Sequence, residues 1–376
     1  MKVIFLAPDS YLARHFMLGW QNAFVAMGHD FVHADPAQDD LSKLLESTEA
    51  PLVMVGSGEG LLCLDLAQLK ACGARVAYNG LPANPQNASF DPHTPLADLA
   101  ELDFLAQIEH KTCFSQHEPE YLEAYYGHYY ARGIETLYLP YAADITLMAD
   151  WEFNPTPEYD LVFVGNLAHR KKGNIKPLRQ IFSGLEPSQL LVYGDQTWQK
   201  CFGIKTSLLT GEIDWRGLYQ SAAIAPNLHS HRQKDRMIQV NDRCFHIAAY
   251  GGFQLIDHPL AAKFFGPDEL AIALGPGDLV EQFFHYLDLP ELRREMIQRA
   301  RERISQDHSH FNRIAALFEA LQIDQPVLWQ GQTYGATTYR SLSPTSEPLS
   351  LLKGRLETMA YNSLRRVKKA ISPPKR

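Results

Sequence analysis

The sequence predicts an α/β protein built from two successive halves, each a parallel sheet covered by helices, and three observations predict this class. Short apolar runs alternate with amphipathic segments of helical length, which is the pattern of βαβ units. The alternation restarts after the proline-rich stretch 154–157. The length of 376 residues also suits two domains, since a domain takes roughly 100–200 residues.

In the first half, glycines mark the ends of two expected helices. Gly28 follows the amphipathic segment 16–27, and Gly73 follows the segment 61–71, which is the usual C-terminal position for glycine. The other pieces are short apolar strands and one short helix. In chain order the expected elements are strand 2–7, helix 16–27, strand 30–33, helix 41–46, strand 51–55, helix 61–71, and strands 74–78, 111–114 and 136–139.

The second half repeats the pattern from residue 160 onward. Two such halves are Rossmann-like domains, and we expect them to face each other across a cleft at the carboxyl ends of their strands. The expected domains are 1–150 and 151–325, followed by a linker and tail over 326–376. The expected elements are strand 160–164, helix 176–182, strands 189–193 and 222–225, a helix over 241–250, strands 253–257 and 270–274, and helices 279–287 and 291–303.

Composition excludes several other classes of protein. Hydrophobic residues make up 45% and charged residues 21%, so the chain is globular rather than disordered. No apolar window approaches the roughly 18 residues of a membrane-spanning helix, and a signal peptide's basic start is missing. The five cysteines are widely spaced without a Cys-x-x-Cys, which favours a reducing cytoplasm over a disulfide or zinc framework. A net charge of -8 argues against a nucleic-acid partner.

A glycine-rich turn over 56–60 follows an expected strand and precedes an expected helix. It resembles a dinucleotide fingerprint incompletely, because its third glycine comes too early and the next strand ends in Tyr78-Asn79 instead of an acid. A nicotinamide cofactor is therefore not expected. The turn is either purely structural or brings Glu59 to the carboxyl end of the strand, where a carboxylate can act as a base or bind a hydroxyl.

Two further stretches suit an anionic ligand. The strand over 160–164 leads through Asn166 to the cations Arg170 and Lys171, beside an expected helix start that favours a diphosphate. A solvated basic loop is the alternative. Farther along, Asn241 or Asp242 can cap a helix whose first turn holds Arg243, so this start is a second candidate anion site with free backbone N–H groups.

His246 shares the helix face of Arg243, although a packed histidine is the commoner case. The sequence does not predict a metal site. The sequence contains two histidine pairs, His229 with His231 and His308 with His310, but no carboxylate or cysteine stands at ligand spacing near either pair. An Asp-x-Asp pair is also missing, as are a P-loop and a Gly-x-Ser-x-Gly elbow.

The order of motifs in the second half resembles a known family, the GT-B glycosyltransferases of the spore-maturation (CgeB-like) group. Pieces of the first half also fit, and the resemblance covers about residues 1–322. The motifs are Val164-Gly165-Asn166 with its cations, Val192-Tyr193-Gly194-Asp195, Gly211-Glu212-Ile213, Ala225-Pro226-Asn227-Leu228-His229, Asn241-Asp242-Arg243-Cys244-Phe245-His246, Gly251-Gly252-Phe253-Gln254-Leu255-Ile256-Asp257, Phe264-Phe265-Gly266-Pro267-Asp268-Glu269, Gly277-Asp278-Leu279, and His310-Phe311-Asn312-Arg313.

The resemblance implies two Rossmann-like domains, with a nucleotide-sugar held mainly by the C-terminal one and no other cofactor. It assigns the donor diphosphate to Arg170, Lys171, Asn241 and Arg243, and close backbone approach to the glycines. His246 stands where relatives commonly carry a glutamate that binds ribose. The donor-binding residues implied are Asn166, Arg170, Lys171, Gly194, Asn241, Arg243, His246, Gly251 and Gly252.

The activity implied is metal-independent, hexosyltransferase-like transfer of a sugar to the hydroxyl of a glycan, lipid-linked or protein acceptor. If the reaction inverts, His15 and Glu59 are the candidate bases in the N-terminal domain. If it retains, the leaving phosphate itself can take the proton. A non-catalytic nucleotide-sugar binder or assembly protein stays open as the alternative, because His246 replaces the acid.

The C-terminal tail differs in charge from the rest of the chain. Residues 326–376 carry nine Lys or Arg and two Asp or Glu, a charge of +7, which leaves -15 on the remainder. Apolar residues over 349–372 recur mostly at three- or four-residue steps, which predicts a basic amphipathic helix after an extended connection. Such a helix can lie on an anionic membrane or dock on the acidic body. We therefore expect a cytoplasmic protein, either soluble or peripheral to the inner face of the membrane.

Overall fold

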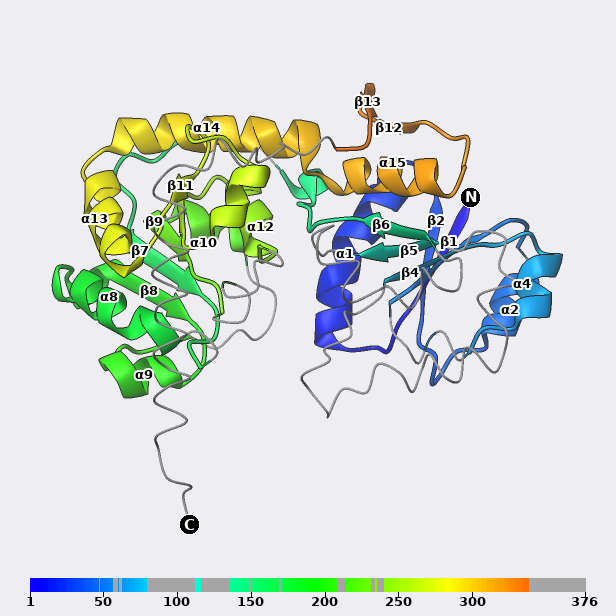
Figure 1. Ribbon diagram of the computed structural model, residues 1–376, viewed down its shortest axis with the longest axis horizontal. Helices are drawn as coiled ribbons and strands as arrows, with labels where there is room; N and C mark the ends of the chain where they lie inside the picture. Colours follow the sequence, from blue (N-terminus) through cyan, green and yellow to red (C-terminus); the bar gives the residue numbers. More distant parts are fainter. Residues whose placement is uncertain are drawn as a thin grey trace, which may run out of the picture. The chain divides into compact units, whose positions relative to one another are not determined.

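The structure is a computed structural model that describes residues 1–46, 48–56, 60, 63–79, 112–115, 135–148, 150–168, 171–207, 214–230, 234 and 240–337. It divides into two compact units (Figure 1). The N-terminal unit comprises Met1–Met148 and Gln306–Thr337, and the C-terminal unit comprises Ala149–Ser305. The tail helix expected over 349–372 lies outside the described residues.

The N-terminal unit contains a parallel sheet of six strands in the order β2-β1-β3-β4-β5-β6. This is a doubly wound order, with the reversal of strand order between β1 and β3. The strands are β1 (Lys2–Leu6), β2 (Asp30–Ala34), β3 (Leu52–Val55), β4 (Arg75–Asn79), β5 (Thr112–Ser115) and β6 (Glu135–Tyr138). The helices are α1 (Tyr11–Ala26), α2 (Leu41–Glu46), α4 (Leu66–Ala71) and the short 3-10 helix η1 (Ile145–Leu147).

The core of this sheet explains why its strands read as unbroken apolar runs. All four residues of β3 are buried, and Ile4, Leu6, Val53 and Val55 pack in one cluster. A strand in the middle of a parallel sheet is covered on both faces, so it needs apolar side chains at every position. On α1, Phe24 is fully buried and stacks on Phe31 of β2 with 6.1 Å between ring centroids.

The C-terminal unit repeats the doubly wound arrangement with five parallel strands in the order β11-β10-β9-β7-β8. Its reversal of strand order falls between β7 and β9, and ligands of such sheets bind outside the carboxyl ends of the strands at that point. The strands are β7 (Tyr159–Val164), β8 (Leu190–Tyr193), β9 (Ala222–Asn227), β10 (Gln254–Ile256) and β11 (Ala271–Ile272). The longer helices are α8 (Lys171–Ser183), α13 (Pro276–Leu287) and α14 (Pro290–Asp307), and the shorter ones are α9 (Thr197–Phe202), α10 (Trp215–Gln220), α12 (Arg243–Ala249), η2 (Pro187–Gln189) and η3 (Pro259–Lys263).

The expected α/β class with two doubly wound halves is confirmed, but the chain does not leave the first half for good near residue 150. After α14 it returns to the N-terminal unit with α15 (His310–Ala320) and the antiparallel hairpin of β12 (Val327–Trp329) and β13 (Gln332–Tyr334). The sequence instead predicts 306–325 in the C-terminal domain and an extended connection after 325. The return is stabilised by aromatic packing, because Phe311 of α15 stacks on Trp329 at 5.0 Å and on Tyr334 at 4.9 Å.

Arg313 ties this returning segment to the rest of the N-terminal unit. Arg313 is 1% exposed, yet its guanidinium donates to five different groups, one of which is the His308 ring at 3.4 Å from Nη2. Nε donates to Pro140 O at 2.9 Å and Nη2 donates to Tyr141 O at 2.9 Å. Nη1 donates to Asp307 O at 3.2 Å and to the Thr337 hydroxyl at 2.6 Å. A buried charge is tolerated here because its donors are matched by carbonyl and hydroxyl oxygens.

Within the described part of the chain, no helix combines the length and apolar composition needed to cross a bilayer.

Candidate functional site

The candidate site lies at the carboxyl ends of β7 and β9 in the C-terminal unit, and Arg243 marks it. The Arg243 guanidinium donates from Nη1 to the carbonyl of Val164, the last residue of β7. It donates from Nη2 to Leu228 O at 3.0 Å, one residue beyond β9. The guanidinium therefore spans the point where the strand order reverses, the place at which such sheets bind ligands.

The ring of Phe163 helps to hold the Arg243 guanidinium in this position. The guanidinium carbon lies 6.0 Å from the centroid of the Phe163 ring, which is fully buried in β7. The two carbonyl bonds use two of the five N–H groups of a guanidinium, and the side chain is half-buried. The remaining donors suit an anion that approaches the carboxyl edge of the sheet.

The backbone at the start of α12 does not form the second anion site that the sequence predicts. Each of the four amides from Arg243 to His246 already donates within the protein. The Arg243 amide donates to the Asp242 carboxylate at 3.0 Å, and the next three donate to the carbonyls of Asn241 and Asp242. Asp242 has helical dihedral angles of -56° and -34°, so the turn before the helix supplies the missing acceptors. Any anion here is therefore bound by the Arg243 side chain.

A buried network of charged and polar groups fixes the loops that follow β9 and β10. His229 is fully buried, and its backbone N–H and Nδ1 meet Asp257 Oδ1 at 2.7 and 2.9 Å. Lys234 Nζ donates to Asp257 Oδ2 at 2.6 Å. The backbone N–H of Asn241 donates to His229 Nε2 at 2.9 Å, so Nε2 is the acceptor and Nδ1 carries the proton. Through His229, Asp257 positions the residue that leads into α12.

The network holds Asp257 ionised and His229 neutral. Burial by itself raises the pKa of the Asp257 carboxyl, but the Lys234 ammonium and the His229 hydrogen bond outweigh it and keep that pKa well below its usual range. Burial lowers the pKa of His229 below the usual 6.5, although Asp257 opposes this change. Sequence reasoning missed Asp257, although an acid directly after a buried strand was the available signal.

The neutral state of His229 makes the stability of the C-terminal unit sensitive to acid. The unfolded chain binds a proton at His229 below about pH 6.5, whereas the folded chain resists it, so stability is lost as the pH falls below 6.5. The loss from one such group is at most about 1.4 kcal/mol per pH unit. Asp257 adds to the loss only below its ordinary value of 3.8. Urea unfolding of wild type and His229→Asn between pH 7.5 and 5 should show a flatter profile for the variant.

His285→Asn is the matched control, because His285 is an exposed histidine near the end of α13. Its pH profile should follow that of wild type. Equal slopes for wild type and His229→Asn would mean that the folded protein binds a proton at His229 as readily as the unfolded chain does.

The loop after β7 is organised by Asp195, which follows β8. The amides of Leu167 and Ala168 donate to the two Asp195 carboxylate oxygens at 3.2 and 3.1 Å. Partial burial raises the pKa of this carboxyl, but the backbone amides that bind it outweigh burial and lower that pKa. Asn166 is exposed at the start of the loop. Because Asp195 occupies these two amides, they are not free to bind a ligand.

The remaining site residues expected from the sequence are not brought together within the described residues. Arg170 and Glu59 lie outside them, as do the side chains of Lys171 and His15; Lys171 begins α8 and His15 lies in α1. His246 lies in the last turn of α12 with its ring 6.1 Å from that of Tyr250.

The three glycines expected to admit a ligand have packing roles instead. A Cβ on Gly194 would stand under 3 Å from Gly165 O and the Trp198 indole, whose nitrogen donates to that same carbonyl at 2.9 Å. A Cβ on Gly252 would meet Ile247 and Tyr219 at 2.9 Å. Gly251 has φ of +80°, and the space where its Cβ would lie is filled by the Trp151 indole. Protein atoms therefore occupy the approach that the resemblance assigned to the donor.

Gly251→Ala should destabilise the C-terminal unit far more than Gly203→Ala, although both glycines follow a helix in left-handed conformation. Gly203 has φ of +73°, and its Cβ would meet no atom within 4 Å, so alanine adds only backbone strain of about 1–2 kcal/mol. At Gly251 the overlap with Trp151 adds about 1–3 kcal/mol. Urea unfolding of both variants measures the difference. Equal losses would mean that Trp151 moves aside without cost.

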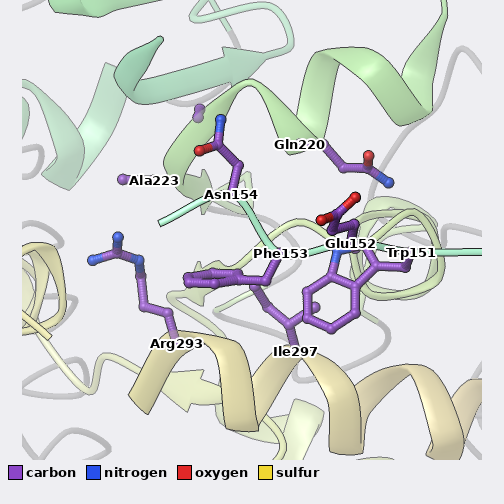
Figure 2. A pocket seen from close by; sticks show the side chains of 10 residues that line it. Trp151, Glu152, Phe153, Asn154, Gln220, Ala223, Arg293 and Ile297 are labelled. Atoms are coloured by element: carbon purple, nitrogen blue, oxygen red, sulfur yellow. The ribbon is translucent and has the colours of Figure 1, made fainter. Parts of the chain in front are cut away.

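Gly251 also lines a pocket at the opposite edge of the sheet from Arg243. The pocket encloses about 280 Å³, including space open to solvent, and Ala222 at the amino end of β9 forms part of its wall. Figure 2 shows Trp151 and Phe153 along it, with Arg293 and Ile297 entering from α14. Arg293 is 3% exposed and donates to Leu287 O at 2.7 Å. The aromatic side chains of Trp151 and Phe153 thus line a pocket at the amino end of β9, whereas the candidate site lies at its carboxyl end.

Among the residues that the structure describes, no group of three or more His, Cys, Asp or Glu is placed to hold a metal ion.

Comparison with known proteins agrees with the fold. Residues 170–319 match a family model described as glycosyl transferase-like. The matched segment contains β9 and Arg243 and begins after β7. A search of curated proteins gives no significant match.

Solved glycosyltransferases resemble the chain in structure at low sequence identity. A DNA-modifying β-glucosyltransferase, solved with and without uridine diphosphoglucose, is 13% identical with a TM-score of 0.54, over 86% of this chain and 100% of its own. TarM of S. aureus, solved with UDP and α-GlcNAc-glycerol, is 9% identical with a TM-score of 0.51, over 75% of this chain and 57% of its own. An E. coli protein described as trehalose-6-phosphate and bound to UDP-2-fluoro glucose is 10% identical with a TM-score of 0.50, over 86% and 99%.

The architecture is therefore the GT-B fold of glycosyltransferases. Together with the glycosyltransferase-like segment 170–319, it supports an enzyme that transfers sugar.

Proposed function

We propose that the chain transfers a sugar from a nucleoside-diphosphate sugar to an acceptor hydroxyl and that it is a relative of the spore-maturation group. The observation that carries this proposal is the Arg243 guanidinium, which joins the carboxyl ends of β7 and β9 at the reversal of strand order. A diphosphate is the anion that a nucleotide-sugar brings to such an edge. The family match over residues 170–319 and the neighbours solved with UDP compounds support the same donor class.

In this proposal the positive groups act on the leaving diphosphate. Arg243 binds it from the start of α12, and Arg170 and Lys171 add two further positive charges next to one another in the sequence. Negative charge grows on the diphosphate as the bond to the sugar breaks, so cations held in place beforehand lower the barrier. Asn166 lies at the start of the same loop, and His246 can bind a ribose hydroxyl in place of the glutamate of relatives.

The acceptor side belongs to the N-terminal unit, where His15 or Glu59 is the base if the reaction inverts the sugar. If it retains, the leaving phosphate takes the proton. The acceptor class we propose is a glycan hydroxyl, whether lipid-linked or on a protein. TarM, solved with a sugar-glycerol compound, supports this class by analogy of fold.

We also propose that the transfer needs no bound metal ion, because the sequence lacks an Asp-x-Asp pair to bridge a metal and a diphosphate. One neighbour of the same fold, the T4 phage enzyme, was solved with UDP and Mn2+. Activity measured with EDTA and then with added Mn2+ decides the point. Unchanged rates are expected, and a rate restored by Mn2+ after loss in EDTA would overturn this part.

The experiment that tests the function is a panel of UDP-, GDP- and dTDP-sugars incubated with the purified chain. Slow hydrolysis of one donor is expected, because water replaces a missing acceptor in many transferases of this kind. Arg170→Ala and Lys171→Ala should each weaken binding of that donor, and Lys43→Ala, an exposed cation on α2, should not. Binding without hydrolysis would favour the non-catalytic binder that His246 leaves open. No binding of any donor would overturn the proposal.

The basic segment 349–372 extends the proposal to a membrane surface. Lys and Arg occur along this segment beside a stripe of apolar residues, and each cation near an anionic surface contributes about 1 kcal/mol. The full chain should sediment with vesicles that contain anionic lipid at low salt, and a chain that ends at Pro348 should stay in solution. If the two behave alike, the segment docks on protein instead.

A further inference from the structure

Three buried carboxamides form a relay at the carboxyl end of β9. Gln254 Nε2 donates to Cys244 O at 2.6 Å. Asn227 Nδ2 donates to Gln254 Oε1 at 3.2 Å, and Asn241 Nδ2 donates to Asn227 Oδ1 at 2.8 Å. Asn227, Gln254 and Asn241 are 0%, 3% and 6% exposed, so water does not compete for these bonds.

The hydrogen bonds of the relay can run in only one direction, which is set by the carbonyl of Cys244 at its start. The carbonyl of Cys244 can only accept, so Gln254 must present its NH2 group there and its oxygen to Asn227. Asn227 then presents its NH2 group to Gln254 and its oxygen to Asn241. Asn241 must in turn donate, which directs its own oxygen away from the relay. Turning any one carboxamide around would bring two oxygens or two NH2 groups face to face.

The end of the relay is an acceptor that lacks a donor among the described residues. Asn241 Oδ1 is buried and makes no hydrogen bond with them. The residue cannot turn to find a donor, because its backbone N–H is bound to His229 Nε2 and its side-chain nitrogen to Asn227. Buried polar atoms are rarely left in this state unless a ligand or water satisfies them.

The position of this oxygen relates it to the candidate site. Its two partners, Asn227 and His229, flank Leu228, whose carbonyl binds the Arg243 guanidinium at 3.0 Å. The acceptor and the cation therefore lie at the same carboxyl end of β9. A phosphate would be repelled by a carboxamide oxygen, so the oxygen is suited to a neutral donor, and the assignment of Asn241 to the diphosphate is replaced.

We propose that Asn241 Oδ1 accepts a hydrogen bond from a hydroxyl of the bound nucleotide sugar, either on the ribose or on the transferred sugar. The proposal rests on the nucleotide-sugar function proposed above. The relay from Cys244 through Gln254 and Asn227 keeps the oxygen, and not the nitrogen, directed at that hydroxyl. Gln254 and Asn227 are positioning residues for this contact.

Calorimetric titration of wild type and Asn241→Ala tests the contact with two series of probes, UDP and GDP, their 2′-deoxy and 3′-deoxy forms, and UDP-glucose and GDP-mannose. Removal of the contacted hydroxyl should weaken binding to wild type about tenfold and binding to Asn241→Ala hardly at all. Dependence on a ribose hydroxyl identifies the ribose. Dependence confined to the sugar conjugate identifies the transferred sugar.

Gln254→Met tests the relay while leaving Asn241 in place, and thermal unfolding confirms that each variant is folded. The dependence on the hydroxyl should shrink in this variant, because the carboxamides lose their anchor. Gln220→Met is the matched control: Gln220 Nε2 also donates to a carbonyl, that of Tyr250 at 2.9 Å, but on the pocket at the other edge of the sheet. Full dependence on the hydroxyl should persist there.

The outcomes separate the two proposals. If wild type binds nucleotides but every hydroxyl contributes equally in wild type and Asn241→Ala, the contact is wrong and the function stands. If wild type binds neither these probes nor a dTDP-sugar, the proposed function is wrong and the contact falls with it.

Discussion

Replacing Arg313 with leucine is expected to lower the free energy of unfolding of the N-terminal unit by about 3–5 kcal/mol, the magnitude for breaking a buried charged network. The substitution removes the donor from the carbonyls of Pro140, Tyr141 and Asp307, and from the Thr337 hydroxyl. Leucine fills part of the space but leaves the Pro140 and Tyr141 carbonyls without this donor, and each such loss costs about 1–3 kcal/mol. Asp307 O keeps the Thr337 hydroxyl as a donor. Urea unfolding of the two proteins measures the change.

Arg294→Leu is the control for this prediction. Arg294 lies on α14, its side chain is 48% exposed, and its ion pair joins Glu291 three residues away. Such surface pairs contribute about 0–1 kcal/mol, so the control should unfold close to wild type. A loss for Arg313→Leu no larger than that of Arg294→Leu would mean that residues 306–337 are not anchored through this guanidinium.

Arg243→Ala is expected to weaken donor binding about 10- to 100-fold, which corresponds to about 1.5–3 kcal/mol for a hydrogen bond to a charged group. From the sequence alone we would expect an unchanged fold for this variant, and the structure corrects that expectation. The carbonyls of Val164 and Leu228 lose their donor, so the free energy of unfolding of the C-terminal unit should also fall by about 1–3 kcal/mol.

Two further variants separate binding from stability at this position. Arg243→Lys keeps the charge but cannot reach both strand ends as a planar fork does, so it should recover part of the affinity and little of the stability. Arg299→Ala removes an exposed arginine of α14 that pairs with Asp268 and Glu295, and it should change neither quantity. Donor titration and urea unfolding give both numbers for each protein. Wild-type affinity in Arg243→Ala would exclude this edge of the sheet as the diphosphate site.

Much of the candidate site follows from local sequence. A short apolar run such as Leu161–Val164 is typical of a strand buried on both faces, and in a parallel sheet the residues after it lie at the ligand-binding edge. The resemblance carried by the order of motifs led to Arg243, whose guanidinium lies at that edge in the structure. Both inferences depend on residues that are neighbours in the chain.

Other features depend on residues far apart in sequence, and local patterns could not predict them. The space that side chains at Gly251 and Gly252 would need is filled by Trp151, Ile247 and Tyr219. Both glycines are therefore required for packing. The amides after β7 are taken by Asp195 from the end of β8. The sequence could not settle either point, because a glycine or a free N–H looks the same in sequence whether a ligand or a distant residue occupies it.

Adjacent residues encode the two doubly wound sheets, their parallel strands and the carboxyl edge at which Arg243 lies, because apolar periodicity and helix ends are local properties of the chain. Long-range contacts fix where residues 306–337 belong, since Phe311 and Arg313 reach partners in the hairpin and near residue 140 that no local pattern reveals. They also fix the direction of the carboxamide relay. Asn227, Gln254 and Asn241 are ordinary polar residues in sequence, and only their burial together obliges each to donate in one direction and leaves the Asn241 oxygen without a donor among the described residues.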